Sequence, residues 1–268
     1  MRGLQVIVLF IIMLVIVAPA SILAAPAQLS TTAKSALEKV MSNADAKVAS
    51  SLRLQYSTLL TLQEQEQQWD EKIKELHAQN EEALLLLRKQ IKLIDADKLS
   101  KLETEVKKAK EQYQPLFDSY TSLNQQIKVA RILKNKKLNS LLRSQADVMQ
   151  IAVQLARQDI RSKEEIFQTA KDNKAKTVKK LRALLSDIDP IKVKIKSERN
   201  RMAKPKQRFT SEWKTLNSSV KKGEAKSILN TLTSIVTISK QVNEHKLKIH
   251  GHEKTINAIL LSVKARIP

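Results

Sequence analysis

The chain has 268 residues, a formal net charge of +21, three glycines and no cysteine. Glycine most readily adopts the positive φ of tight turns, so its scarcity argues against sandwiches, barrels and nucleotide-binding α/β folds, which need many such turns. The absence of cysteine excludes disulfide scaffolds, cysteine-based zinc fingers, iron–sulfur clusters and thiol catalysis. These counts leave an all-α chain as the expected fold class.

Residues 1–27 have the features of a secretory signal peptide. One early cation is followed by the apolar run Val6–Ala18 and by an Ala-Pro-Ala motif at residues 25–27. The alternative is an uncleaved membrane anchor, because Leu4–Ala25 is 22 residues long and a bilayer needs roughly 20. Either way we expect a secreted or extracytoplasmic protein, and export without cysteine favours a bacterial source.

Residues 31–94 contain no glycine and no proline, and their apolar side chains recur at alternating spacings of three and four. Such a period, sustained over several heptads, is typical of coiled-coil packing and predicts a long helix. Glu66 and Asn80 interrupt this apolar stripe. Its members are Leu37, Met41, Ala44, Val48, Leu52, Leu59, Leu62, Trp69, Ile73, Leu76, Ala83, Leu87 and Ile94.

Two acidic breaks follow the stripe, and both indicate helix boundaries. The first is Asp95-Ala96-Asp97, in which Asp97 is expected to cap the next helix. At the second, Asp189 precedes Pro190, and an aspartate cap followed by proline is a strong helix-start signal. We therefore expect the chain to fold back at both breaks. Gly251 is expected to end the last helix.

The predicted fold is an elongated antiparallel helical bundle or coiled coil of three to five long helices. Residues 28–268 are expected to form one elongated domain, with a weak duplication of residues 95–186 in residues 187–268. The alternative to duplication is that all helical bundles of biased composition resemble themselves. Three helices would span about 31–94, 97–187 and 190–266; five result if the chain also turns near residues 135 and 223.

The positive charge is concentrated in one part of the chain. Residues 28–97 have a net charge of −2, whereas residues 171–226 have a net charge of +12. This density creates a long-range potential that attracts polyanions. The alternative is a solvated helix face that keeps the protein soluble by repulsion. The candidate polyanion-binding residues are Lys171, Lys174, Lys176, Lys179, Lys180, Arg182, Lys192, Lys194, Lys196, Arg199, Arg201, Lys204, Lys206 and Arg208.

Signatures of catalysis or metal binding are missing from the sequence. There is no nucleophile elbow, no P-loop and no His-Glu-x-x-His motif, so we expect no enzyme activity, no catalytic residue and no cofactor. His250, His252 and Glu253, with His245 nearby, form the one metal-like cluster. We interpret them as exposed residues near a helix end and predict no metal site.

The expected function is that of an exported, non-enzymatic coiled-coil scaffold or binding protein at the cell surface. Its basic segment, residues 171–226, would dock electrostatically on anionic envelope polymers or membrane. Self-association through coiled-coil seams is a further expectation. Sequence-specific binding to nucleic acid is not expected, because no helix-turn-helix or basic-zipper signature is present and aromatic residues are few.

An α-helical pore-forming toxin or membrane-perturbing component is the alternative function. Such toxins resemble this chain in architecture, because they are secreted bundles of long helices with little cysteine. The longest uncharged run after residue 27 is Ser227–Ser239, with 13 residues. This run is short for a bilayer span.

Overall fold

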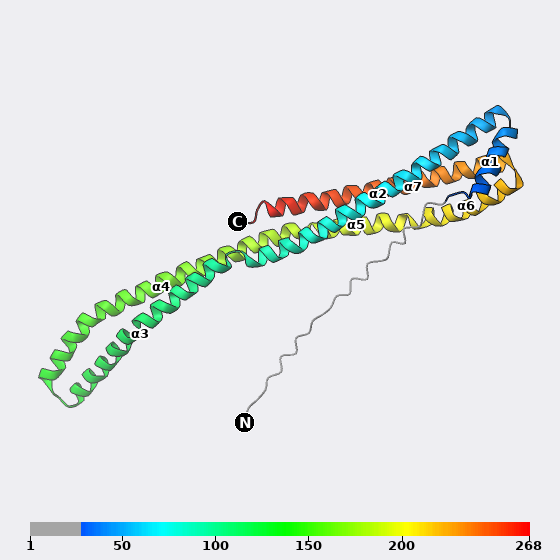
Figure 1. The fold of residues 1–268 in the computed structure, drawn as a ribbon. Helices are drawn as coiled ribbons and strands as arrows, with labels where there is room; N and C mark the ends of the chain where they lie inside the picture. The colour runs from blue at the N-terminus through cyan, green and yellow to red at the C-terminus, as the bar shows by residue number, and fades with distance from the viewer. Residues whose placement is uncertain (1–27) are drawn as a thin grey trace, which may run out of the picture. The chain divides into compact units, whose positions relative to one another are not determined.

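The computed structural model describes residues 28–268; the predicted signal peptide or anchor lies outside the described residues. Helices hold 93% of the described chain, which contains no strand, and the predicted all-α helical bundle is confirmed (Figure 1). The helices of this part are α1 (Thr31–Asn43), α2 (Ala46–Leu93), α3 (Ala96–Ile132), α4 (Lys136–Ser186), α5 (Ile188–Arg201), α6 (Ala203–Lys222) and α7 (Ala225–Lys264).

The described chain divides into two compact units, each built from segments that are far apart in the sequence. Unit 1 contains residues 28–64 and 206–240, and unit 2 contains residues 65–205 and 241–268. The boundaries fall inside α2, α6 and α7. The single-domain organisation and the duplication stay predictions.

The apolar stripe predicted for residues 31–94 is confirmed. Each of its thirteen side chains is buried or half-buried. The helix that carries it is divided at Ala44-Asp45, a break that the sequence analysis missed. The signal for this break is Asp45, whose carboxylate accepts hydrogen bonds from the backbone N–H groups of Lys47 and Val48, both at 3.0 Å. These bonds satisfy two donors that the first turn of α2 would otherwise leave unpaired.

Unit 1 has an apolar core to which all four of its helical segments contribute. Leu37 of α1, Leu52 and Leu59 of α2, Leu216 of α6 and Ile235 of α7 are almost completely buried in it. Full burial of such side chains stabilises the fold by roughly 1.5–3 kcal/mol each. This apolar cluster therefore holds unit 1 together.

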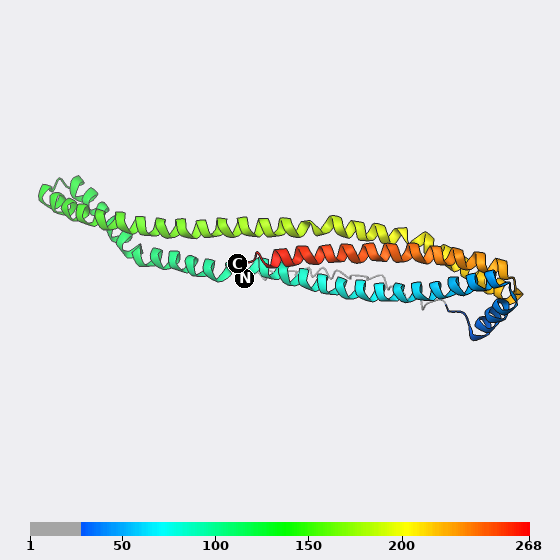
Figure 2. The ribbon, with the colours of Figure 1, turned by 90° about the horizontal axis from the view of Figure 1, so that it is seen from above.

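The chain reverses direction at two turns, and each contains a residue with a positive φ. Lys134, with φ of 52°, lies in the turn between α3 and α4, and Gly223, with φ of 74°, lies between α6 and α7. Figures 1 and 2 show both reversals. At Asp95 and Asp187, by contrast, the next helix continues in the direction of the last (Figures 1 and 2). The predicted fold-backs at the acidic breaks are therefore wrong.

The acidic breaks and the reversals differ in the backbone around them. Two residues, Ile94 and Asp95, lie between α2 and α3, and Asp95 has a φ of 52°, whereas the single residue between α4 and α5, Asp187, keeps a helical backbone with φ of −64° and ψ of −14°. At both reversals the residue after the positive-φ residue closes the end of the preceding helix, because Asn135 N–H donates to the Ala130 backbone oxygen at 3.1 Å and Glu224 N–H donates to that of Ser219 at 3.2 Å. At the reversal before α4, three residues, 133–135, lie outside the helices, and the side chain of Asn135 caps α4 by accepting from Leu138 N–H at 3.1 Å.

Three further predictions of helix ends are wrong. Asp97 and Asp189 do not cap their helices; they lie in the first turns of α3 and α5, where their charge interacts favourably with the helix dipole. Gly251 does not end a helix, because α7 continues through it to Lys264. A glycine is tolerated at this interior position at a cost of about 1 kcal/mol relative to alanine.

Unit 2 contains two sections of different construction. The three-helix section consists of residues 65–93 of α2, the end of α4 with α5, and residues 241–264 of α7, around one apolar cluster. The hairpin consists of α3 and residues 136–170 of α4, which lie side by side (Figure 1). A small cluster near the end of the hairpin contains the buried residues Leu123, Ala130, Leu142 and Ala146.

None of the helices in residues 28–268 combines the length with the apolar character that crossing a bilayer requires.

Candidate functional site

The structure places the predicted polyanion-binding residues on three successive helices. Thirteen of the fourteen cations are exposed, and Lys174 is half-buried. α4 carries Lys171, Lys174, Lys176, Lys179, Lys180 and Arg182; α5 carries Lys192, Lys194, Lys196, Arg199 and Arg201; α6 carries Lys204, Lys206 and Arg208.

Twelve of these cations belong to unit 2, whereas Lys206 and Arg208 belong to unit 1. We name the surface that carries the eleven cations from Lys171 to Arg201 the α4–α5 basic surface. Because α5 continues in the direction of α4 (Figure 2), this surface is about 45 Å long at 1.5 Å per residue. The structure thus brings most of the predicted site together on one run of helix.

Few of these cations are neutralised by the protein itself. Among the described residues, only Lys192 and Arg201 of the fourteen form ion pairs, with Glu81 at 2.7 Å and Glu198 at 3.0 Å. The Lys171 ammonium lies 5.2 Å from the centre of the Phe167 ring. Residues 28–97, whose net charge is −2, therefore contribute a single ion pair to the α4–α5 basic surface, through Glu81.

The structure also shows a polar seam that the sequence indicated only through the breaks at Glu66 and Asn80. Lys246 of α7 is 2% exposed. Its ammonium donates hydrogen bonds to Asp70 Oδ2 at 2.6 Å and to the backbone oxygen of Glu66 at 3.4 Å, and it lies 2.8 Å from Glu66 Oε1. Two carboxylates thus compensate one cation that is held out of water.

A second polar cluster lies further along the same two helices. Glu253 of α7 is 1% exposed. His77 donates to its Oε1 at 2.8 Å, and the Asn80 amide donates to its Oε2 and to its backbone oxygen, both at 2.9 Å. The amide of Asn257 in turn donates to Asn80 Oδ1 at 3.1 Å. Both oxygens of this buried carboxylate therefore accept a hydrogen bond from the protein, which replaces the missing contact with solvent.

These contacts shift the acidity of both partners. Burial alone would raise the pKa of Glu253, but the hydrogen bonds from His77 and Asn80 outweigh burial and lower that pKa below its usual value. The hydrogen bond to Glu253 raises the pKa of His77. Both shifts favour the charged pair, a carboxylate facing an imidazolium.

The two clusters follow one register. Asp70 and Lys246 are 176 residues apart in the sequence, as are His77 and Glu253, and the second pair lies one heptad beyond the first on each helix. A constant difference means that α2 and α7 run parallel to each other. A slip of one heptad would place Lys246 opposite His77, or Glu253 opposite Asp70. Because such pairs carry like charges, the seam specifies a single register.

The third contact of this kind joins α7 to α5. His245 lies 2.6 Å from Glu198 Oε2, and Glu198 also accepts a hydrogen bond from Arg201 at 3.0 Å. The hydrogen bond with His245 lowers the pKa of Glu198. Together with the pair of Lys192 and Glu81, polar contacts connect all three helices of the three-helix section.

The members of the metal-like cluster point to different partners. His245 contacts Glu198, Glu253 contacts His77 and Asn80, and the His250 ring lies 5.2 Å from the ring of Trp69. No group of His, Asp or Glu side chains within residues 28–268 is arranged to hold a metal ion. The structure therefore does not bring this cluster together. The interpretation of its members as exposed residues is wrong, because Glu253 is buried and the three histidines are half-buried.

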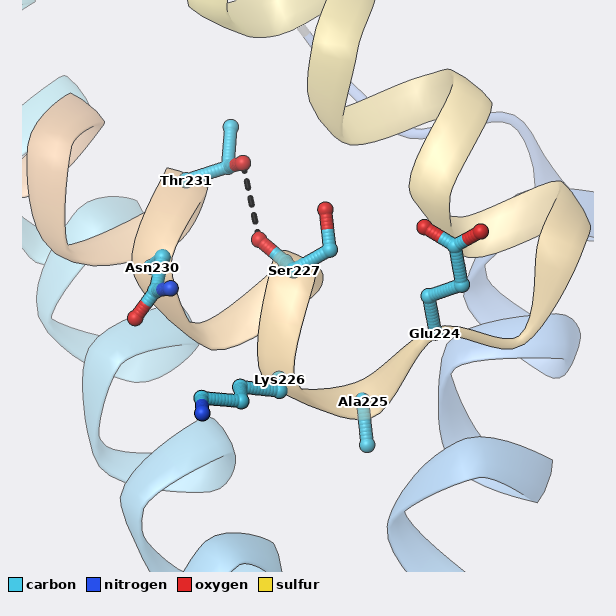
Figure 3. Close-up of a pocket in the computed structure, with 6 residues that line it drawn as sticks. All are labelled: Glu224, Ala225, Lys226, Ser227, Asn230 and Thr231. Atoms are coloured by element: carbon cyan, nitrogen blue, oxygen red, sulfur yellow. Dashed lines mark hydrogen bonds between the residues drawn. The ribbon is translucent and has the colours of Figure 1, made fainter.

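An open pocket of about 550 Å³ lies at the start of α7 in unit 1. Figure 3 shows its lining residues spread over the turn before α7 and the first turns of that helix, with Thr231 donating to the Ser227 backbone oxygen at 2.8 Å. None of the predicted site residues lines it. The lining residues are Glu224, Ala225, Lys226, Ser227, Asn230 and Thr231.

Comparison with known proteins yields no relative: no family model matches the chain, and neither a curated protein nor a solved structure matches it.

Proposed function

We propose that this chain is an exported, non-enzymatic helical binding protein whose α4–α5 basic surface docks on an anionic polymer or membrane of the cell envelope. The observation that supports the proposal is a surface of eleven cations, ten of them exposed and only two in ion pairs within the described chain. The export step rests on the sequence of residues 1–27.

The arrangement suits a repeating polyanion better than a small anion. The cations are spread along about 45 Å of helix, and none of them lines the pocket at the start of α7. Each exposed contact is weak, so affinity would come from many contacts made together and from the release of counterions. Binding of this kind falls steeply as the salt concentration rises.

The test measures retention of residues 28–268 on immobilised dextran sulfate and on uncharged dextran as salt increases. We expect retention on dextran sulfate alone, with an affinity that falls by about tenfold or more between low and physiological salt. Five substitutions on the basic surface should weaken binding and flatten the salt dependence. They are Lys176→Gln, Lys179→Gln, Lys180→Gln, Lys194→Gln and Lys196→Gln, all at exposed positions without an ion pair in residues 28–268.

A control variant removes the same charge elsewhere. It carries Lys34→Gln, Lys39→Gln, Lys47→Gln, Lys98→Gln and Lys101→Gln, which replace exposed lysines outside the basic segment. We expect this control to bind nearly as well as the unmodified chain. Equal weakening by the two variants would show that net charge, rather than the α4–α5 basic surface, governs binding. Salt-independent retention would contradict the electrostatic mechanism.

A membrane-perturbing function is the second candidate, and a separate observation favours it. Ile132 and Leu133, between α3 and α4, are 77% and 69% exposed. Release of a trapped dye from anionic vesicles by micromolar protein would support this function. Intact vesicles to which the protein has bound would contradict it.

A further inference from the structure

The turn between α3 and α4 exposes apolar side chains to water. We name residues 128–141 the hairpin tip. Every residue from Arg131 to Leu138 is exposed. Single exposed apolar side chains are ordinary in folded proteins, whereas several of them gathered on one surface mark an interaction site. The exposed apolar residues of the tip are Val129, Ile132, Leu133, Leu138 and Leu141.

The local packing explains why these side chains stay outside. Ala130 and Ala146 are among the few buried residues near the tip, so the two helices approach closely and leave little interior space. Lys134 adopts a positive φ of 52°, and residues 133–135 form the turn. Ile132 ends α3 and Leu133 begins the turn, so both residues lie at the end of the hairpin, where α3 and α4 are joined (Figure 1).

The same tip is strongly and uniformly cationic. No aspartate or glutamate occurs from residue 119 to residue 146, whereas six lysines and arginines do. All six are exposed, and none forms an ion pair within the described chain. Lys128, Arg131, Lys134, Lys136 and Lys137 belong to the tip, and Arg143 lies two residues beyond it.

We propose that the hairpin tip binds the surface of an anionic lipid membrane, with its cations on the headgroups and Ile132 and Leu133 in the acyl region. A soluble polyanion would leave the apolar side chains in water, and an apolar protein groove would oppose the cations. An anionic bilayer interface offers negative headgroups directly above hydrocarbon, so it accommodates both kinds of side chain. This site is distinct from the α4–α5 basic surface and does not rest on the proposed function.

The test measures sedimentation of residues 28–268 with phosphatidylcholine vesicles, with and without about a third of phosphatidylglycerol. We expect binding to the anionic vesicles, and a loss of about tenfold in partitioning for the variant Ile132→Ser with Leu133→Ser. A control variant, Leu93→Ser with Leu261→Ser, replaces two similarly exposed apolar residues of unit 2 that lie outside both the tip and the α4–α5 basic surface. It should bind within about twofold of the unmodified chain. Unchanged binding of the tip variant would overturn the proposal.

A second measurement reports insertion directly. Because the chain has no cysteine, the variant Leu133→Cys can be labelled at one position with a polarity-sensitive dye. Anionic vesicles should shift its emission to the blue, whereas a label at Leu93→Cys, which is exposed and lies outside both cationic surfaces, should not respond. The absence of a shift at Leu133→Cys in protein that has bound would overturn the insertion.

The same variants separate this inference from the proposed function. The tip variant should keep its affinity for dextran sulfate, and the five-lysine variant of the α4–α5 basic surface should keep its binding to anionic vesicles. If only the five-lysine variant loses vesicle binding, the membrane docks on the basic surface and the tip proposal is wrong. If only dextran sulfate binding is absent, the proposed function fails while the tip proposal stands.

Discussion

Within unit 2, the three-helix section buries charged groups, whereas the hairpin exposes apolar ones. Lys246 and Glu253 are almost completely buried in the three-helix section, whereas Ile132 and Leu133 are exposed to solvent at the end of the hairpin. The difference follows from the number of neighbours. A helix that faces two others has several partners for a polar side chain at the seam, while a helix in a two-helix hairpin has one seam and one partner.

The α4 helix illustrates this limit. Two apolar rows run along its hairpin part, and a single neighbouring helix can cover only one of them. Leu142, Ala146, Val153 and Ala156 are buried, whereas Leu141, Val148, Ile151 and Leu155 are exposed. The exposed row repeats at intervals of seven residues through positions 141, 148 and 155.

The largest predicted effect comes from removing the anions of the buried cation. We expect Glu66→Gln with Asp70→Asn to lower the free energy of unfolding by about 3 kcal/mol, because Lys246 is left buried without a countercharge. The converse change, Lys246→Met, should lower the free energy of unfolding by less than about 1 kcal/mol, because both carboxylates reach solvent and the methionine side chain fills the space of the lysine. Urea unfolding measures both values. Similar losses for the two variants would show that burial of Lys246 is not what makes the seam sensitive.

The hairpin offers a matched pair at adjacent positions. Leu142 is 8% exposed and Leu141 is 58% exposed. Leu142→Ala should therefore lower the free energy of unfolding by about 2 kcal/mol. This value is at the low end for a core leucine, because the surrounding cluster is small. Leu141→Ala should change stability by less than about 0.5 kcal/mol. Hydrogen exchange of the α3 and α4 amides resolves both effects, and an equal loss from Leu141→Ala would show that its row is covered.

Gly251→Ala is expected to stabilise the three-helix section without touching its polar contacts. Apart from the two neighbouring residues and the nearby backbone of α7 itself, no atom lies within 4 Å of the place where an alanine Cβ would stand. The substitution should raise the free energy of unfolding by about 1 kcal/mol, the difference in helix propensity. Thermal unfolding followed by circular dichroism measures the gain. A loss of stability would mean that α7 is packed more tightly at this point than the structure shows.

Helical periodicity predicted the fold class and the stripe that each half of α2 buries, because these properties are local. It identified Glu66 and Asn80 as breaks in the stripe but not their partners, since Lys246 and Glu253 lie more than 170 residues away. A turn near residue 135 was predicted only as an alternative, and the residue with the positive φ there is Lys134, although lysine rarely adopts this conformation. Periodicity could not decide which row of α4 is buried either, since both rows fit a helix.

The exposure of the basic residues was predicted better than the turns. Exposure of the basic cations follows from charge alone, because lysine and arginine are seldom buried without a partner. Lys246 is the instructive exception: its surroundings in the sequence contain no feature that distinguishes it from the exposed Lys248 two residues later. Only the register between α2 and α7 brings two carboxylates to it.

The smallest predicted effect is a pH dependence confined to the polar seam. The raised pKa of His77 means that its contribution to stability is complete below the unfolded value and is lost as the pH rises through the folded one. Burial lowers the pKa of His250. Its contribution to stability is therefore complete above the unfolded pKa and is lost as the pH falls through the folded pKa. Above about pH 6.5, the ordinary pKa of histidine, His77 therefore determines the trend, and the unfolding temperature should fall as the pH rises through the raised pKa of His77.

The acid side of the profile has the opposite sign. Glu198 and Glu253 have lowered pKa values, so their stabilisation is present above the unfolded value and is lost as the pH falls through the folded one. The variant His77→Gln should abolish the decline on the alkaline side, because glutamine does not titrate, and should retain a decline in acid through Glu198. An alkaline decline that persists in this variant would place the titrating group outside the seam.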